Sequence, residues 1–172
     1  MRTLLSAGAI AVMATSAFAG DWTGGYVGLG LGYGDVNVTG GIPGGEDYTY
    51  GIHAGYDYDF GDWVVGGEFE YDWMDFDIDN GAVKLDNVAR LKFKVGYDFG
   101  PALSYLIAGS TRAYTSGAGD DTGYLYGIGA AYAFTPQWML SAEVLRHEYS
   151  DFNSTGVDVD AETVNLRASF RF

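Results

Sequence analysis

Residues 48–60 read YTYGIHAGYDYDF, and this stretch decides the fold. Every even position from Tyr48 to Phe60 holds a tyrosine, isoleucine, alanine or phenylalanine, whereas the odd positions hold threonine, glycine, histidine or aspartate. Side chains alternate between the two faces of a β-strand, so a period of two predicts a strand with one apolar, aromatic face and one polar face. The spacing of an amphipathic helix is absent, and the glycines would disfavour a helix.

The same period continues along most of the chain. In the segment at 63–74 the polar face is acidic, and in the segment at 83–99 the polar face is basic. Counted in this way, the sequence predicts eight strands, at residues 24–36, 48–60, 63–74, 83–99, 102–114, 123–134, 138–149 and 161–172.

The connections between these segments are of two kinds. Those after even-numbered segments have two or three residues, at 61–62, 100–101 and 135–137, whereas those after odd-numbered segments are longer and rich in Gly and Asp. Short turns at one end and longer loops at the other are typical of an up-and-down antiparallel sheet inserted into a membrane from one side. Eight strands are enough to close into a small barrel.

The charged residues indicate which face of the strands points outward. A soluble barrel of the lipocalin type would bury many Tyr and Trp side chains, whose hydroxyl and indole groups need partners. In a membrane the same residues face lipid and form aromatic girdles near the strand ends. We therefore predict an all-β protein, an eight-stranded antiparallel up-and-down transmembrane β-barrel. Its polar face would carry seven of the eight Lys and Arg after residue 20, all except Arg146: Lys84, Arg90, Lys92, Lys94, Arg112, Arg167 and Arg171.

The first 19 residues have the pattern of a secretory signal peptide. Arg2 is followed by an apolar run and by small residues that end in Ala17-Phe18-Ala19. The apolar run has roughly half of the about 20 residues that a membrane-spanning helix needs. We therefore predict cleavage after Ala19, with residues 1–19 as the signal peptide and residues 20–172 as the barrel domain.

Composition excludes several classes of function. The net charge of −14 would repel nucleic-acid phosphates, so no nucleic acid is expected as a partner. The chain has no cysteine, which excludes disulfides, thiolate nucleophiles and Cys-ligated metal centres. A hydrophobic content of 48% with 16% aromatic residues excludes an acidic disordered chain. No cofactor is predicted.

The C-terminal strand adds an independent signal. Residues 164–172, VNLRASFRF, alternate up to Phe170 and a terminal Phe172. This strand resembles the terminal-aromatic strand by which the barrel assembly machinery recognises bacterial outer-membrane barrels.

Two further stretches carry a family resemblance: WTGGYVGLGLGYGD at 22–35 and FTPQWMLSAEVLRHEYSDF at 134–152. The chain is similar to the Omp25/Omp31-type outer-membrane β-barrel family of Gram-negative α-proteobacteria, relatives of the small OmpA- and OmpX-type barrels. The resemblance implies an integral location in the cell outer membrane, with outer-membrane lipids, lipopolysaccharide and the assembly machinery as partners. Arg146 and His147 stand where members commonly have Tyr and Arg, so no functional detail is transferred across that strand.

Charges on the polar face are predicted to form ion pairs inside the barrel. A register that keeps both apolar faces outward would place Glu70 opposite Arg90 and Glu68 opposite Lys92. The interior of an eight-stranded barrel is just wide enough for side chains to fill, which favours a structural ion-pair plug. The alternative is a selectivity filter or proton path, which would make the protein a narrow pore for ions or small solutes. The predicted network comprises Glu68, Glu70, Arg90, Lys92, Lys94, Arg112, Glu143 and Arg167.

The sequence offers few candidates for catalysis. Lipid-modifying barrels place a His and a Ser two residues apart on one lipid-facing strand, but here His147 and Ser150 are three apart and fall on opposite faces. His53 faces the interior, where Thr49 is the hydroxyl residue of matching parity on that strand. We predict that the protein is not an enzyme and rank a lipid-modifying enzyme third.

Acidic loops are the remaining candidates for binding. Asp75, Asp77 and Asp79 resemble the front of a calcium loop, although Asn80 stands where the turn glycine belongs and the flanks are strands. They are weak candidates for a hard-cation site, with a solvated acidic turn as the alternative. Eleven acids and no Lys or Arg lie in and beside the long loops, so these loops should gather divalent cations that also bridge lipopolysaccharide. Alternatively, the acids only keep this end soluble. The leading hypothesis is an integral outer-membrane barrel with a structural or surface-interaction role in the envelope.

Overall fold

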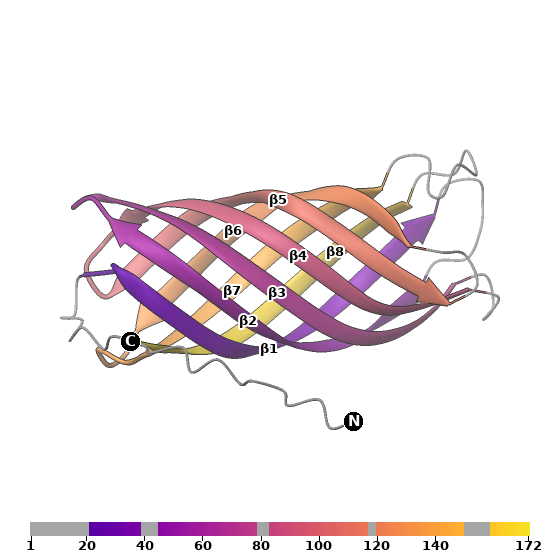
Figure 1. Ribbon diagram of the computed structural model, residues 1–172, viewed down its shortest axis with the longest axis horizontal. Coiled ribbons are helices and arrows are strands. Elements are labelled where there is room, and N and C mark those ends of the chain that lie inside the picture. The colour runs from indigo at the N-terminus through magenta and orange to yellow at the C-terminus, as the bar shows by residue number, and fades with distance from the viewer. Residues whose placement is uncertain (1–20, 39–44, 79–82, 117–119, 150–158) are drawn as a thin grey trace, which may run out of the picture.

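A closed barrel of eight antiparallel strands is formed by the residues that the structure describes (Figure 1). The computed structural model describes residues 21–38, 45–78, 83–116, 120–149 and 159–172, and the predicted signal peptide at 1–19 lies outside them. Each strand pairs with the next along the chain, and β1 pairs with β8 to close the barrel, as predicted. The strands are β1 (Gly24–Val38), β2 (Gly45–Asp59), β3 (Trp63–Ile78), β4 (Val83–Asp98), β5 (Ala102–Ser116), β6 (Asp121–Ala133), β7 (Trp138–Tyr149) and β8 (Val159–Arg171).

The two ends of the barrel differ in their connections. The C-terminus lies at the end with the short turns (Figure 1), where Gly61 and Gly100 have φ values of 103° and 85° that favour glycine. Outer-membrane barrels keep short turns on the periplasmic side and longer loops on the extracellular side. The two ends are therefore called periplasmic and extracellular below. Within the described ranges, no helix is long and apolar enough to cross a membrane.

Strand β3 is longer than predicted at its extracellular end. It continues past the predicted boundary, so Asp75 and Asp77 lie on a strand. A β-bulge between Trp73 and Phe76 shifts the register there. The prediction that Asp75 and Asp77 lie in a loop is therefore wrong, because strand pairing resumes beyond the bulge. Asp79 lies outside the described residues.

Apolar side chains cover the outside of the barrel, and charged side chains lie inside it. Leu31 and Leu166, register partners on β1 and β8, are 70% and 66% exposed on the outer face. On the inner face Glu68, Lys92 and Arg167 are 4%, 2% and 4% exposed. A soluble barrel shows the reverse arrangement, so the predicted direction of the two faces is confirmed.

Strand β5 is an exception to the predicted pattern. Leu103, Tyr105 and Ile107 are buried on its inner face, while Arg112 faces outward. The prediction that Arg112 lies in the lumen is therefore wrong. Apolar residues occupy both faces of β5, so alternation alone does not show which face points inward. Pairing with β4 decides it. Arg112 lies opposite Ala89, which belongs to the outward face of β4.

Apolar clusters occupy both ends of the lumen. At the periplasmic end, Trp22 and Leu103 belong to a cluster of buried hydrophobic residues. At the extracellular end, a smaller cluster joins Val88, Ala113 and Tyr149. The larger cluster also reaches Leu125, the register partner of His147, so the charged residues of the inner face have apolar neighbours, beside which an unpaired charge would be costly.

Candidate functional site

A layer of buried charges crosses the middle of the lumen. Glu68 and Glu70 stand two residues apart on β3, so both point inward. The register of β3 with β4 places Glu68 opposite Lys92 and Glu70 opposite Arg90. This register keeps the aromatic faces of both strands toward lipid, because a slip by one residue would turn them inward.

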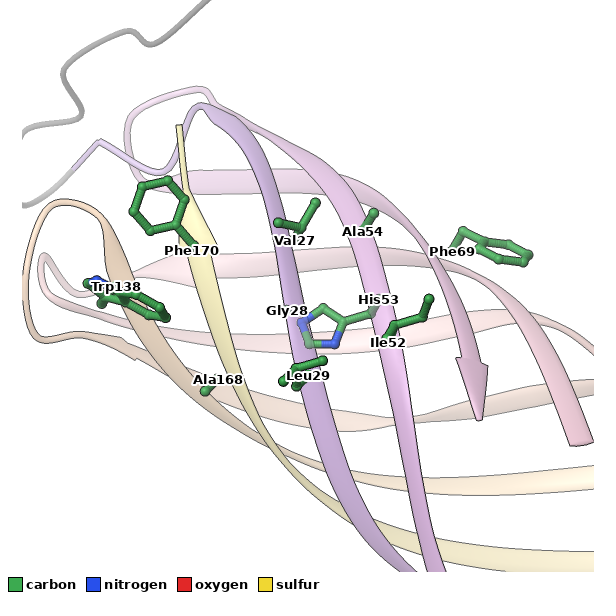
Figure 2. Close-up of a pocket in the computed structure, with 10 residues that line it drawn as sticks. All are labelled: Val27, Gly28, Leu29, Ile52, His53, Ala54, Phe69, Trp138, Ala168 and Phe170. Carbon is green, nitrogen blue, oxygen red and sulfur yellow. The ribbon is translucent and has the colours of Figure 1, made fainter. Parts of the chain in front are cut away.

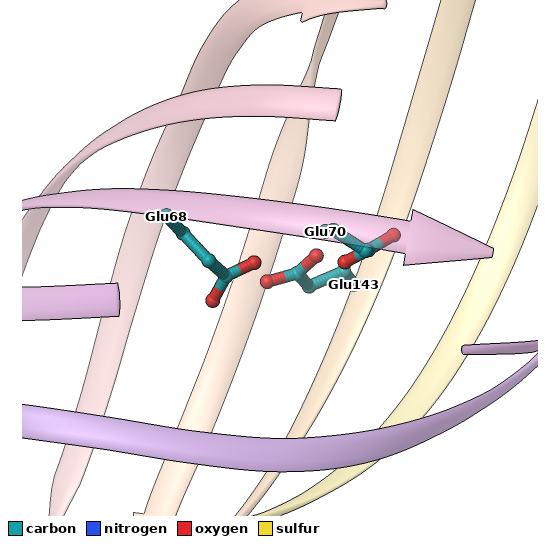
Figure 3. A group of neighbouring side chains, drawn as sticks. All are labelled: Glu68, Glu70 and Glu143. Carbon is teal, nitrogen blue, oxygen red and sulfur yellow. The ribbon is translucent and has the colours of Figure 1, made fainter. Parts of the chain in front are cut away.

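Three carboxylates from two strands meet at the centre of this layer. Figure 3 shows Glu68 and Glu70 on β3 and Glu143 on β7 pointing into one shared space. Lys92 Nζ contacts an oxygen of each, at 2.6, 2.6 and 2.7 Å in that order. The guanidinium of Arg167, on β8, contacts the same three at 2.5, 3.2 and 2.5 Å. The centre of the layer is thus a compact cluster that joins four strands.

The same carboxylates are close enough to share a metal ion. One oxygen from each of Glu68, Glu70 and Glu143 lies within 4.8 Å of the others. Lys92 and Arg167 already contact these oxygens, and a divalent ion would have to replace one of these cations or be repelled by both. We therefore assign the cluster as ion pairs and not as a metal centre.

Arg90 extends the layer toward the extracellular end. Its Nη1 donates to Glu70 Oε1 at 2.5 Å and also to Asp72. Its Nε donates to His147 Nε2 at 2.9 Å, so that ring nitrogen is an acceptor. The ring proton then resides on Nδ1, which lies 3.4 Å from the carbonyl oxygen of Ala161. His147 therefore continues the network onto β7 without adding a charge.

Two inward tyrosines extend the layer toward the periplasmic end. The Tyr26 hydroxyl donates to Glu68 Oε2 at 2.7 Å, and the Tyr105 hydroxyl donates to Glu143 Oε1 at 3.0 Å. Lys94 Nζ lies 4.6 Å and 5.2 Å from the centroids of these two rings. Neither tyrosine was predicted inside the barrel, because the alternation of the sequence favours aromatic residues on the lipid face. Their hydroxyl partners are what make them suitable for the interior.

The structure brings seven of the eight predicted network residues into the lumen. Lys94, the most periplasmic of them, pairs with Asp57 Oδ2 at 3.0 Å. The eighth, Arg112, lies on the outer surface and pairs with Asp120 at 3.3 Å. Arg146, predicted to be off the polar face, is likewise outside and pairs with three surface acids: Glu148, Asp160 and Glu162.

The space beside the charged layer is narrow. Polar and small residues line a gap there between β1, β2, β3 and β8, and this gap has no room for a water molecule. Side chains therefore fill this part of the lumen, as the width of an eight-stranded barrel leads one to expect. The gap is lined by Gly30, Gly32, Thr49, His53, Glu70, Asp72, Asn165 and Arg167.

A buried His–Ser contact was also missed from the sequence. His53 Nε2 lies 2.7 Å from Ser169 Oγ, and both residues are buried in the lumen. The sequence predicts Thr49, on the same strand, as the hydroxyl residue nearest to His53, whereas Ser169 lies on β8. The two meet across Gly28 of β1, beside which Figure 2 shows the His53 ring. No sequence pattern signals this pair, because only closure brings β2 and β8 to either side of β1.

The outer face over the same place carries a shallow groove (Figure 2). It forms where small residues, Gly28, Ala54 and Ala168, leave room between larger ones. Its walls are apolar apart from the His53 ring, which reaches the groove beside Gly28, and the groove is part of the lipid-facing belt. The wall residues are Val27, Leu29, Ile52, Phe69, Trp138 and Phe170.

The two residues of the predicted assembly signal have different surroundings. Phe170 faces outward beside Trp138, with ring centroids 5.3 Å apart. Phe172 N donates to Gly25 O at 3.0 Å, and the Phe172 ring occupies the space where a Cβ on Gly25 would lie. The terminal residue is therefore part of the closure between β8 and β1 in the finished barrel.

Comparisons with known proteins place the chain in a family. A family model described as the outer membrane protein beta-barrel domain matches residues 3–172. The 25 kDa outer-membrane immunogenic protein of Brucella abortus is 30% identical over 156 residues, which cover 83% of this chain and 71% of that protein. The 31 kDa outer-membrane immunogenic protein of Brucella melitensis is 25% identical over 237 residues, with coverage of 99% and 95%.

Two solved structures share the fold. Neisserial surface protein A has a TM-score of 0.61 at 20% identity, covering 87% of this chain and 98% of that chain. Ail, the attachment invasion locus protein of Yersinia pestis, has a TM-score of 0.59 at 19% identity, with coverage of 87% and 99%. The Brucella relatives and the family match confirm the predicted resemblance. The chain belongs to the outer membrane protein β-barrel family and is an integral β-barrel protein of the outer membrane.

Proposed function

We propose that the protein is a closed, non-conducting barrel with a structural and surface-interaction role in the cell envelope. The observation that carries the proposal is that Lys92 and Arg167 each contact all three central carboxylates, Glu68, Glu70 and Glu143. These contacts tie β3, β4, β7 and β8 together across the lumen. Opening a passage would separate buried charges from their partners, which is energetically costly.

A narrow pore for ions or small solutes is the second candidate. The lumen is lined by charged side chains, and a pore would require their ion pairs to rearrange so that the carboxylates face a passing ion. Planar-bilayer conductance of residues 20–172, the predicted mature chain, separates the two proposals. We expect no conductance above the bare bilayer, and a large, steady conductance would overturn the closed barrel.

A lumen variant sharpens this test. The double variant Lys92→Gln with Glu68→Gln removes one cation and one carboxylate from the central cluster, so the net charge of the lumen is unchanged and the side-chain volumes stay similar. The matched control is Leu91→Ala, which changes the lipid-facing neighbour of Lys92 on the same strand. Conductance in the double variant but not in the control would show that the ion pairs act as a gate and would favour the pore. Absence of conductance in both variants supports the closed barrel.

We also propose that the barrel is not an enzyme. His53 and Ser169 are 4% and 1% exposed, and of the two only His53 lines the outer groove, so the Ser169 hydroxyl that would act as nucleophile offers no access to a substrate. His147 is 2% exposed and accepts a hydrogen bond from Arg90, and Ser150 lies outside the described residues. Incubation with purified lipopolysaccharide, followed by mass spectrometry of the lipid, is expected to show no change. Loss of an acyl chain that requires folded protein would overturn this proposal.

The extracellular rim supports the surface part of the proposal. The polarity of the outer face changes from apolar to charged within one row of register, which is the level where lipid headgroups begin. The charged row on β7, β8, β1 and β2 is Arg146, Glu162, Asp35 and Glu46. The row beneath it on the same strands is Val144, Val164, Tyr33 and Tyr48. We infer that lipopolysaccharide phosphates meet this rim through Arg146 and through divalent cations between them and the acids.

Thermal unfolding in vesicles tests lipopolysaccharide as a partner of the rim. Magnesium, compared with EDTA, should raise the unfolding midpoint in vesicles that contain lipopolysaccharide and not in phosphatidylcholine vesicles. Glu162→Gln on the rim should reduce the magnesium-dependent shift, whereas Glu68→Gln in the lumen should leave that shift unchanged. Equal shifts in both kinds of vesicle would contradict bridging at the rim.

A further inference from the structure

Trp22 lies inside the barrel although it precedes the first strand. Its side chain is 1% exposed and belongs to the apolar cluster of the periplasmic end, together with Tyr26, Val64 and Leu103. Because it lies outside β1, strand alternation does not account for its position. The other tryptophans all occupy outward positions on strands: Trp63, Trp73 and Trp138.

Hydrogen bonds from two strand ends hold Trp22 in place. Its backbone N donates to Asp59 Oδ2 at 3.0 Å, and its indole Nε1 donates to Asp98 Oδ1 at 3.0 Å. Asp59 ends β2 and Asp98 ends β4, both at the periplasmic side. The neighbouring Thr23 Oγ1 accepts from Asp59 N at 3.1 Å. Both N–H groups of Trp22 are therefore satisfied, as a buried tryptophan requires.

Arg171 covers the indole from the other end of the chain. Its guanidinium carbon lies 5.1 Å from the Trp22 ring, and its Nη2 donates to the carbonyl oxygen of Asp21 at 2.6 Å. Arg171 is the last residue of β8 and is the register partner of Tyr26 on β1. The site that receives Trp22 is thus built from the ends of β2, β4 and β8. The Arg171 side of this site is complete only when β8 is paired with β1.

We infer that residues 21–23 form a periplasmic latch, in which Trp22 enters the lumen after the barrel closes and then secures the β1–β8 closure. The latch adds a hydrogen bond and a cation–π contact between the two chain ends, where closure otherwise depends on strand pairing. It also separates the charged layer from periplasmic water, because Tyr26 lies between Trp22 and Glu68. The closed barrel of the proposed function does not depend on the latch, since the central ion pairs stand without it.

A protein with Trp22 as its single tryptophan tests whether Trp22 is buried inside the lumen. The variant Trp63→Phe, Trp73→Phe, Trp138→Phe is refolded into vesicles as residues 20–172. We expect Trp22 fluorescence to resist quenching both by acrylamide in water and by brominated lipid. The matched control keeps only Trp138, which faces lipid, and should be quenched by brominated lipid. Acrylamide quenching of Trp22 as strong as in the urea-unfolded chain would show a free tail and overturn the latch.

The same single-tryptophan protein tests the order of events. During refolding, protection of Trp22 from acrylamide should appear together with or after the folded band on unboiled gels, which reports closure. Protection that precedes the folded band would overturn the proposed order.

Substitution of Arg171 tests its part in the latch. Arg171→Met should raise acrylamide quenching of Trp22 several-fold, because one charge-assisted hydrogen bond contributes about a tenfold factor to an equilibrium. Arg146→Met, which removes a cation from the outer surface, is the matched control and should leave the quenching unchanged. Unchanged quenching in Arg171→Met would show that Arg171 does not help to hold Trp22.

Discussion

His53 on β2 and Ser169 on β8 belong to strands that are not neighbours, yet their side chains meet 2.7 Å apart across β1. Both are register partners of Gly28, which has no side chain to keep them apart. Side chains of both neighbouring strands also occupy the space over Gly32, where a Cβ would collide with Asn165 and Thr49. The inner face of β1 is therefore lined with glycine because side chains from both neighbouring strands occupy the space above it.

Gly28→Ala should destabilise the barrel. An added Cβ would collide with the His53 ring and with the backbone oxygen of Ala168, and the backbone cannot move aside without disturbing the β1–β8 pairing. We expect a loss of about 1–3 kcal/mol in the free energy of unfolding, measured in urea with lipid vesicles. Gly67→Ala is the control, since a Cβ there would meet nothing within 4 Å. Equal losses in the two variants would contradict this reason.

Lys92→Gln should be among the most damaging lumen substitutions. It leaves three central carboxylates with Arg167 as the one cation contacting all of them, and removing one partner of a buried ion pair costs about 3–5 kcal/mol. Adding Glu68→Gln should recover part of this loss, because the double variant removes the uncompensated carboxylate. A double-mutant cycle in urea should show a coupling of about 0.5–3 kcal/mol. Strictly additive losses would mean that the two side chains do not interact.

Leu91→Arg should destabilise the barrel through the lipid face. Leu91 points outward on β4, next to the inward Lys92. A cation at the bilayer midplane costs about 2–4 kcal/mol in a β-barrel. Leu91→Ala measures the loss of apolar contact alone. If the two substitutions reduced the free energy of unfolding equally, Leu91 would not face hydrocarbon.

Phe172 has two roles that can be separated. Deleting Phe172 should sharply reduce the amount of heat-modifiable protein in the outer-membrane fraction, because the terminal aromatic residue is the predicted assembly signal. Gly25→Ala instead displaces the Phe172 ring and leaves the terminal residue in place. It should insert at normal levels with a modest loss of stability, since a terminal side chain can move aside. Normal levels of the deletion protein would argue against the assembly role.

The strands and their faces follow from the sequence because every residue of a membrane barrel wall meets either lipid or lumen. The alternation in 48–60 and its repeats therefore predicts the eight strands and which face is outward. Complementary charges also predict the β3–β4 register, since placing Glu70 opposite Arg90 keeps both aromatic faces in lipid. This reasoning failed for β5, where apolar residues on both faces left the position of Arg112 undecided.

Contacts across the lumen required the tertiary structure. His53 and Ser169 are 116 positions apart, and Arg171 and Asp21 are 150 apart. The sequence by itself determined the fold and the polarity of its faces through the repeated period of two, and it determined the two ends of the barrel through the lengths of the connections. The periodicity of one strand shows which residues point inward. It does not show which inward residues meet. That depends on the curvature that brings β8 back to β1, because only closure places side chains from non-neighbouring strands within hydrogen-bond distance.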